Sequence, residues 1–412
     1  EQVFTPRAFE VNPAMYVDRP DLEAALTSAL RSNKQVIVHG ESGSGKSWLY
    51  KKTLTDLNCV YQIADCANAS RLGSLTKEFG TITARRKPVT KTGYDETKKA
   101  GIGVPGFGSG ELSHVGKFSI ASEDPYEACL STLRAEAGDR MAAIVIDNFE
   151  RIVDNTSLIK EVADIITLTD NPNYAKYKVK LIIVGVPSDL RSYFSEVDQQ
   201  NTIANRLTEI PEVSRLNVDQ VRQFVKQGFV SELQYDFDDP TVDEIARHVA
   251  WATDRIPQHL HEYCYELALI GAIHNGVISP NDLLLADSAW LKSSLASSYT
   301  TIEGHMNSKS TAAGRRNQTI YALGQCTSHD FRYGEIEEII RSQFPNSTQD
   351  LSLNVSQLLS GLSEGDSPLI TQTPKGDAYR FVSPKYRMCI RVMLRKDTSG
   401  NRVEKIELGS LY

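Results

Sequence analysis

The sequence contains no long hydrophobic run. None of its apolar stretches approaches the roughly 18 uninterrupted residues of a membrane-spanning helix, so we expect no transmembrane segment. The chain starts at Glu1 without a methionine, so an N-terminal signal could have been trimmed, but none is visible in this sequence. We therefore expect a cytoplasmic protein that does not associate with a membrane.

Cysteine is scarce and scattered. The six cysteines are Cys59, Cys66, Cys129, Cys264, Cys326 and Cys389. No two of them form a C-x-x-C pair, and none has a histidine at the spacing of a metal site. Neither a zinc site nor a disulfide framework is expected, and reduced thiols in a cytoplasmic protein are the simplest interpretation.

The chain also lacks an excess of positive charge. Its 45 lysines and arginines face 52 aspartates and glutamates, and the net charge of −7 gives no reason to expect nucleic-acid binding by the whole surface. The hydrophobic fraction of 41% excludes disorder throughout. At about 150 residues per domain, the 412 residues predict two or three domains.

Short apolar runs alternate with helical patterns in the first half of the chain. The runs cover residues 35–39, 60–63, 141–147 and 179–186, and helical patterns occur at 22–31 and 47–57. Continuous apolarity indicates strands buried on both faces, as in a parallel sheet covered by helices. We therefore predict an α/β domain over residues 1–215, followed by a helical lid domain and linker helix over 216–306.

The last part of the chain predicts a winged-helix domain over residues 317–400. Helical patterns at 317–326, 334–343 and 351–362 precede two short strands at 369–373 and 379–382. Three helices followed by a hairpin is the order of a winged helix, which is a helix-turn-helix variant. The polar segment from Asn307 to Arg316 is interpreted as the linker or an exposed turn.

The most specific motif is a G-x-x-x-x-G-K-S phosphate-binding loop. It lies between a predicted strand and a predicted helix and comprises Gly40, Glu41, Ser42, Gly43, Ser44, Gly45, Lys46 and Ser47, with Trp48 directly after it. Its glycines allow backbone N–H groups to surround phosphate oxygens beside the positive end of the helix. Lys46 is expected to reach the β- and γ-phosphates and Ser47 to bind Mg²⁺, which predicts ATP and Mg²⁺ as ligands.

A second acidic motif is expected at the end of another central strand. Asp147 follows Ile144-Val145-Ile146 and is the candidate anchor for Mg²⁺, although a strand-ending aspartate can also cap the next helix. Many ATPases place the catalytic glutamate directly after this aspartate, whereas Asn148 stands here. Glu150 is the available carboxylate for polarising the attacking water, and the alternative is a solvated residue at the start of a helix.

The two motifs, the helical segment and the terminal winged helix resemble the AAA+/STAND superfamily of P-loop ATPases over most of residues 10–396. Within it, the layout is similar to origin-initiator, transposition-regulator and prokaryotic STAND-type defence ATPases. Asp147-Asn148-Phe149-Glu150 is similar to the STAND pattern of aspartate, small residue, apolar residue and acid. This resemblance implies a catalytic role for Glu150.

Further site residues are implied by the same resemblance. Tyr16 and Val17 match the box on the adenine side, and Ser188 matches the polar residue of the first sensor, although a Pro-Ser turn explains Ser188 equally well. Arg206 matches the arginine finger that reaches a neighbouring subunit's γ-phosphate, with an ordinary surface arginine as the alternative.

The lid motif departs from the family. Pro257 matches its proline, but Arg255 replaces the glycine and Gln258 replaces the arginine, with Arg255 and His259 as substitutes. The departure weakens the expected closure of the lid on the γ-phosphate, and with it the expectation of fast turnover.

Two segments are basic within the acidic chain. Residues 80–120 form a glycine-rich insertion with seven basic and three acidic residues. The segment 375–396 contains Lys375, Arg380, Lys385, Arg387, Arg391, Arg395 and Lys396. Either segment is a candidate contact for DNA or another polyanion, and the alternatives are a solvated face or a wing that docks against protein.

These observations favour an ATP-binding and ATP-hydrolysing switch of the AAA+/STAND type. Such a switch forms a homo-oligomer, with ATP between subunits and Arg206 reaching the neighbouring nucleotide. Its output comes from a separate effector protein or from DNA engagement, because no nuclease, protease or deaminase motif is visible. Phage defence or mobile-element control is the biological setting that fits this layout. The alternative function is a DNA-binding initiator or regulator that binds ATP with little or no turnover.

Overall fold

The computed structural model of the chain describes residues 2–86, 124–185, 201–307, 314–349, 351–373, 375–397 and 399–408. It separates into two compact units. We call residues 20–41 and 49–213 the sheet unit, and residues 1–19, 42–48 and 214–412 the helical unit. Most of the glycine-rich insertion and all of residues 186–200 lie outside the described residues.

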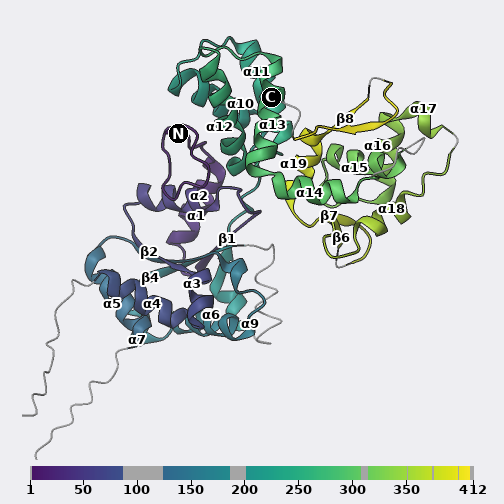
Figure 1. Cartoon of the computed structure of the whole chain (residues 1–412). Coiled ribbons are helices and arrows are strands. Elements are labelled where there is room, and N and C mark those ends of the chain that lie inside the picture. Colours follow the sequence, from purple (N-terminus) through teal and green to yellow (C-terminus); the bar gives the residue numbers. More distant parts are fainter. Residues whose placement is uncertain are drawn as a thin grey trace, which may run out of the picture. The chain divides into compact units, whose positions relative to one another are not determined.

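The sheet unit is built on five described parallel strands in the order β2-β3-β4-β1-β5. The strands are β1 (Gln35–His39), β2 (Val60–Asp65), β3 (Ala142–Asp147), β4 (Val179–Gly185) and β5 (Leu207–Glu209). Their register places Asp65 beside Asp147 at the carboxyl edge, where β2 and β3 both end. The parallel α/β fold predicted from the apolar runs is confirmed (Figure 1).

Alternate residues of the central strands face two different hydrophobic clusters. Val36, Val145 and Ile182 pack with side chains of α1 and α2, whereas Ile37 and Ile144 pack with side chains of α3 to α6. Helices therefore cover both faces of the sheet (Figure 1). The helices and helical turns of this unit are α1 (Pro20–Arg31), α2 (Lys46–Asp56), α3 (Cys66–Leu72), α4 (Leu75–Arg86), α5 (Pro125–Ala137), η1 (Phe149–Arg151), α6 (Thr156–Leu168), α7 (Pro172–Ala175) and α9 (Asn201–Arg206).

The predicted start of the insertion at residue 80 is wrong, because helix α4 extends to Arg86. Residues 80–86 belong to α4 and not to a glycine-rich loop, because Leu75, Phe79 and Ile82 are spaced as one buried helical face. The carboxylate of Glu161 fixes the start of this helix, since it accepts hydrogen bonds from the N–H groups of Leu75 and Thr76. The rest of the predicted insertion, from residue 87 to 120, lies outside the described residues.

The helical unit begins with the predicted lid. It consists of α10 (Val218–Val225), the π-helix η2 (Lys226–Glu232), α11 (Asp239–Ala252), α12 (Pro257–Ile273), α13 (Pro280–Ser294) and α14 (Ala296–His305). A capping box of Asn217 and Gln220 starts α10, and the side chain of Asp238 caps α11. Phe4 of the N-terminal segment packs into this core, against Phe224 and Phe229.

The end of the chain has the order of a winged helix, as predicted. Its elements are α15 (Arg315–Gln325), α16 (Tyr333–Gln343), α17 (Pro345–Thr348), α18 (Val355–Leu362), β6 (Ile370–Gln372), β7 (Tyr379–Phe381), α19 (Pro384–Met393), β8 (Leu394–Lys396) and β9 (Val403–Lys405). Phe331 bridges to Tyr379 as the short third strand of the wing. The single helix predicted over 351–362 is shorter, since α18 begins at Val355 after Asn354 adopts a left-handed conformation.

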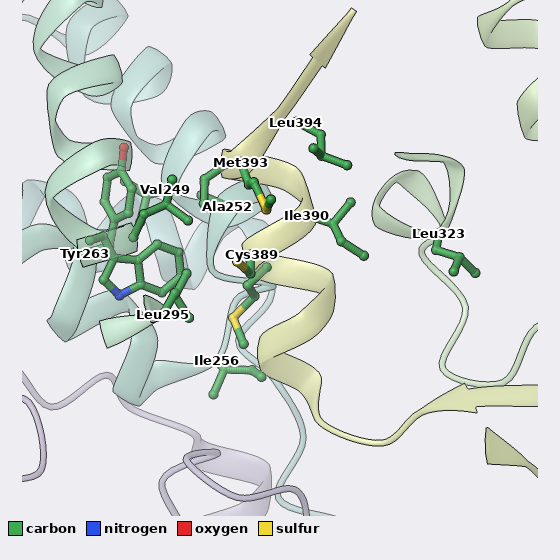
Figure 2. Packing of buried hydrophobic residues seen from close by; sticks show 14 of the residues in the cluster. Val249, Ala252, Ile256, Tyr263, Leu295, Leu323, Cys389, Ile390, Met393 and Leu394 are labelled. Carbon is green, nitrogen blue, oxygen red and sulfur yellow. The ribbon is translucent and has the colours of Figure 1, made fainter. Parts of the chain in front are cut away.

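Helix α19 is the central packing element of the helical unit. Cys389 and Met393 lie against the lid residues Val249, Ala252 and Leu295, and Ile390 faces Leu323 of α15 (Figure 2). Gly324 allows this close approach, because a Cβ there would lie 2.4 Å from Ile390 Cγ2. Lid and winged helix therefore share one continuous core.

All six cysteines are free and buried, which agrees with the expected reduced thiols. Burial raises the pKa of the Cys59 thiol to about 11, which keeps this thiol protonated. None of the described helices is long and apolar enough to span a membrane.

Candidate functional site

The phosphate-binding loop connects β1 to α2, and its glycines are required by its conformation. Gly43 has φ +78° and Gly45 has φ +93°, values that side chains with a Cβ rarely adopt. Helix α2 begins at Lys46, so the motif directly precedes a helix N-terminus. The local geometry is therefore that of a nest of backbone N–H groups for an anion.

The predicted lid motif contacts this loop inside the helical unit. The N–H of Gln258 donates to the carbonyl of Gly43 at 3.2 Å. A Cβ on Gly43 would lie 3.1 Å from side-chain atoms of both Ile256 and Gln258. Pro257 starts α12 beside Gly45, with its Cγ 3.8 Å from where a Cβ of that glycine would stand. The residue at the family's arginine position therefore touches the loop through its backbone.

Arg19 contacts the phosphate loop, although no role was predicted for it from the sequence. One guanidinium nitrogen donates to the carbonyl of Ser44 at 2.9 Å, and another donates to Ser214 at 3.2 Å. Arg19 thus fixes the loop backbone from the segment before α1. No local sequence signal identifies this role, because Arg19 and Ser44 are 25 residues apart and meet only in the fold.

The adenine-side residues line a pocket of about 210 Å³ in the helical unit. Tyr16 and Val17 form one wall, and Gln223 and Gln227 of the lid form another. The remaining lining residues are Pro13, Ala14, Met15 and Phe224. Tyr16 and Val17 stay a prediction for the base site, and Gln223 of α10 and Gln227 of η2 had no sequence signal.

Trp48 connects the start of α2 with the lid. Its Nε1–H donates to the carbonyl of Ala8 at 3.3 Å, and its indole meets the ring of His261 edge-on at 5.3 Å. His261 is buried and accepts a hydrogen bond from the N–H of Thr5 at Nδ1. Burial lowers the pKa of His261 to about 4, so the ring is neutral at pH 7.

Asp147 is held at the end of β3 by donors of the sheet unit. Its Oδ1 accepts the N–H of Asn148 at 2.8 Å, and its Oδ2 accepts the hydroxyl of Tyr50 at 2.9 Å. Asn148 has φ 58°, the left-handed conformation that asparagine tolerates, and it turns the chain into η1. The alternative role of Asp147 as a helix cap is not seen, since the cap of η1 is Asn148 and makes no side-chain hydrogen bond.

Glu150 lies in the first helical turn after β3 and is exposed. Its carboxylate is directed toward the end of β4, where a Cβ on Gly185 would stand 3.2 Å from Glu150 Oε2 and 2.6 Å from Phe149 Cβ. The glycine at this strand end therefore makes room for η1. Because β4 lies between β3 and β1, Glu150 faces the side of the sheet on which the P-loop strand lies.

Two further positions implied by the resemblance are Arg206 and Ser188. Arg206 ends α9, and its Nε donates to Asp170 Oδ2 at 2.5 Å within the same subunit. Its side chain is 26% exposed. Ser188 lies outside the described residues.

The basic segment 375–396 requires a correction. Arg387 and Arg391 are buried in α19 and pair with Asp254 at 3.0 and 3.2 Å, so they are not available to DNA phosphates. Arg380 pairs with Asp330 at 3.1 Å. Among the described basic residues of this segment, Lys375, Arg395 and Lys396 are exposed. The number of basic residues in this segment overestimated its basic surface, because helical periodicity turns Arg387 and Arg391 inward.

The residues present fit a bound nucleoside triphosphate. Gly43 and Gly45 have the positive φ angles of an anion-binding loop. The buried hydroxyl of Ser44 has no hydrogen-bond partner among the described residues. Hydroxyl and carboxylate oxygens such as those of Ser47 and Asp147 are the ligand types that suit Mg²⁺.

Comparison with known proteins agrees with this geometry. Residues 30–194 match the family model of the AAA domain. No curated protein matches the sequence.

Two solved structures are similar to almost the whole chain. A Walker-type ATPase of Pyrococcus abyssi has 14% identity and a TM-score of 0.52, covering 94% of this chain and 99% of that one. The ORC2 protein of Aeropyrum pernix, solved in ADPNP and ADP complexes, has 13% identity and a TM-score of 0.52, covering 95% and 96%. At these identities the likeness concerns the fold, and the match to the AAA domain is limited to residues 30–194.

Proposed function

We propose that this protein is an ATP-dependent switch that binds ATP with Mg²⁺, hydrolyses it slowly and changes its assembly state with the nucleotide. The observation that carries the proposal is the loop of Gly43 and Gly45, which is held open by positive φ angles and has the lid residue Gln258 hydrogen-bonded to it. A lid attached directly to the phosphate loop can respond to the presence of a phosphate.

Each site residue then has a stated role. Lys46 and the loop N–H groups bind the phosphates, and the pocket of Tyr16 and Val17 takes the base. When bound, Mg²⁺ supplies charge neutralisation between the β- and γ-phosphates, with Ser47 and Asp147 as the residues that hold it. Glu150 accepts the proton of the attacking water.

Nucleotide binding is tested by calorimetric titration of ATP into wild type and Lys46→Ala. The variant should lose binding, because it removes the lysine that the motif aims at the phosphates. Lys52→Ala is the matched control, since Lys52 lies on the same helix and pairs with Asp56 at 2.6 Å. Equal ATP affinity of Lys46→Ala and Lys52→Ala would reject the phosphate-loop assignment.

Hydrolysis is tested separately with Glu150→Gln. This change keeps the size of the side chain but removes the base, so ATP affinity should stay unchanged while phosphate release stops. Wild-type turnover in Glu150→Gln would assign the base to another residue. We expect slow turnover in wild type for two reasons. Asn148 stands where many ATPases have the catalytic glutamate, and Gln258 replaces the arginine of the lid motif.

Self-assembly is the finer part of the proposal, with Arg206 as the contact to a neighbouring nucleotide. Within one chain Arg206 is paired with Asp170, so a trans role requires the guanidinium to exchange this partner for phosphate. Light scattering with and without ATP should show assembly by wild type that Arg206→Ala reduces. Arg222→Ala, which removes another arginine paired with aspartates, is the control.

We further propose that the switch acts through a separate effector protein, with prokaryotic defence or mobile-element control as the setting. Purification of the native assembly in the presence of ATP, followed by mass spectrometry of stably bound proteins, tests this step. Recovery of the same partner with Lys46→Ala would show that nucleotide does not control the association.

A second candidate function is DNA binding through the wing, and the observation that favours it is the exposed Lys375 at the hairpin between β6 and β7. Helix α18, at the position of the recognition helix of a winged helix, carries no lysine or arginine. Any DNA contact should therefore be to phosphates and insensitive to sequence. Lys375→Ala should reduce the slope of log affinity against log salt by about one if this function is real.

A further inference from the structure

A fully buried tyrosine contacts the carboxylate that is proposed to serve Mg²⁺. Tyr50 is the fifth residue of α2, one turn after Lys46, and none of its surface is exposed. Its ring packs in the hydrophobic cluster that also contains Val145 of β3. Its hydroxyl donates to Asp147 Oδ2 at 2.9 Å. Tyr50 therefore connects the helix of the phosphate loop with the strand of the acidic motif.

The hydrogen bond fixes an orientation that packing alone leaves undetermined. An aspartate carboxylate rotates easily about χ2, because this terminal torsion has a broad energy profile. Here the backbone N–H of Asn148 restrains Oδ1 and the Tyr50 hydroxyl restrains Oδ2, so the plane of the group is defined. Since the tyrosine ring is held in the core, the hydroxyl is a rigid donor.

We propose that Tyr50 is a positioning residue that orients Asp147 toward Mg²⁺ during ATP binding and hydrolysis. This inference rests on the proposed function. A phenol is a suitable donor for this task, because it fixes the carboxylate without adding a positive charge that would compete with the metal ion. Tyr50 acts through Asp147 and does not itself need to touch the nucleotide.

The matched control comes from the same unit. The hydroxyl of Tyr174 in α7 also donates to an aspartate at 2.9 Å, namely Oδ2 of Asp124, the N-cap residue of α5. Tyr50→Phe and Tyr174→Phe therefore each remove one tyrosine–aspartate hydrogen bond of equal length and keep the ring. A difference between them reports the position of the bond and not its loss as such.

The experiment measures ATP affinity across a Mg²⁺ titration, together with thermal unfolding. Tyr50→Phe should raise the Mg²⁺ concentration at half-saturation about tenfold, as expected for loss of a partner that orients a ligand. Its ATP affinity in EDTA should match that of wild type, because the phosphate loop is unchanged. Tyr174→Phe should show the wild-type Mg²⁺ dependence.

A double variant separates positioning from a general structural effect. In an Asp147→Asn background, Tyr50→Phe should add no further shift in Mg²⁺ dependence, since it acts through the carboxylate that is already gone. Additive effects, or a Tyr50→Phe titration equal to that of Tyr174→Phe, would overturn the proposal. An unfolded Tyr50→Phe would also overturn it, because the hydroxyl would then be a requirement of the fold.

The outcomes for Tyr50 and for the proposed function are distinguishable. If wild-type ATP affinity does not depend on Mg²⁺, or if Asp147→Asn leaves that dependence unchanged, the proposed role of Asp147 fails. If both controls behave as expected and Tyr50→Phe alone has no effect, only the inference about Tyr50 fails.

Discussion

Asp147 in the sheet unit and Asp254 in the helical unit are two aspartates whose carboxylates are bound by different kinds of donor. Asp147 accepts hydrogen bonds from a tyrosine hydroxyl and a backbone amide at the end of β3. Asp254 lies in the turn between α11 and α12, is 6% exposed, and pairs with three guanidinium groups. The tyrosine hydroxyl and the backbone amide orient the Asp147 carboxylate without adding a charge, whereas the three arginines neutralise the Asp254 carboxylate.

The Asp254 cluster has the properties of a structural ion-pair centre. Arg215, Arg387 and Arg391 lie at 2.5, 3.0 and 3.2 Å from its oxygens. Burial alone would raise the pKa of Asp254, but the three arginines outweigh it and lower the pKa. Arg391 also donates to the carbonyls of Gly324 and Trp251, whereas the buried Nε of Arg387 has no hydrogen-bond partner among the described residues.

The surroundings of each aspartate indicate its role. The cluster joins the lid turn, which directly precedes α12 and its residue Gln258, to helix α19 of the winged helix. The ion pairs of Asp254 therefore hold parts of the helical unit together. Asp147 is presented by its donors at a strand end, where a parallel sheet places ligand-binding groups.

The largest effect is expected from Asp254→Ala. It would leave buried arginines without their counter-ion and should lower the free energy of unfolding by about 3–5 kcal/mol. Urea titration with a helical probe measures this loss. Asp239→Ala, which removes an exposed aspartate paired with Arg222 and Lys226, should leave stability nearly unchanged. If the two variants were equally stable, the structural role of Asp254 would be refuted.

Asp147→Asn should give the opposite result. The isosteric amide keeps the packing, so the unfolding midpoint should stay close to that of wild type. Phosphate release should fall about 100-fold, since the carboxylate proposed for Mg²⁺ is lost. A large loss of stability with retained turnover would remove the distinction between the two aspartates.

Gly185→Ala tests the strand-end geometry beside Asp147. The new Cβ would stand 2.6 Å from Phe149 Cβ, so η1 and Glu150 have to move. We expect a loss of about 1–3 kcal/mol in the free energy of unfolding, together with slower turnover. Gly304→Ala is the control, because a Cβ there meets no atom within 4 Å. Wild-type turnover in Gly185→Ala would show that Glu150 needs no such placement.

The last prediction concerns His261, a buried residue for which no ion pair is seen among the described residues. Its effect on stability should be the smallest of the four. Because burial lowers the pKa of His261 to about 4, the unfolded chain binds its proton near pH 6.5 and the folded chain does not. Stability should therefore fall as pH decreases from about 6.5 to 4, by at most about 2 kcal/mol between pH 7 and pH 5.

His261→Gln should remove this pH dependence, which unfolding curves at pH 7 and pH 5 would measure. Burial alone would raise the pKa of Glu262, but His259 and Gln258, among other groups, lower it to about 2. The contribution of Glu262 to stability is therefore lost only as pH falls below about 4.5 toward 2. The two windows hardly overlap. An unchanged pH dependence in His261→Gln would assign the effect to other groups.

The sequence by itself determined the parts that depend on local pattern. The apolar runs of β1, β3 and β4 identified the parallel sheet, because a strand buried on both faces has to be apolar throughout. The motif from Gly40 to Ser47 identified the phosphate loop, since its backbone conformation excludes residues other than glycine at Gly43 and Gly45. The order of three helices and a hairpin identified the winged helix.

Only the tertiary structure decided which distant side chains meet. Tyr50 and Asp147 are 97 residues apart, and Arg387 and Asp254 are 133 apart, so no local spacing connects them. The sequence showed Arg387 and Arg391 as part of a basic stretch, and the packing of α19 turned them into the core around one aspartate. Burial of a charge is favourable only where a partner from another element is present, and that partner is set by the fold.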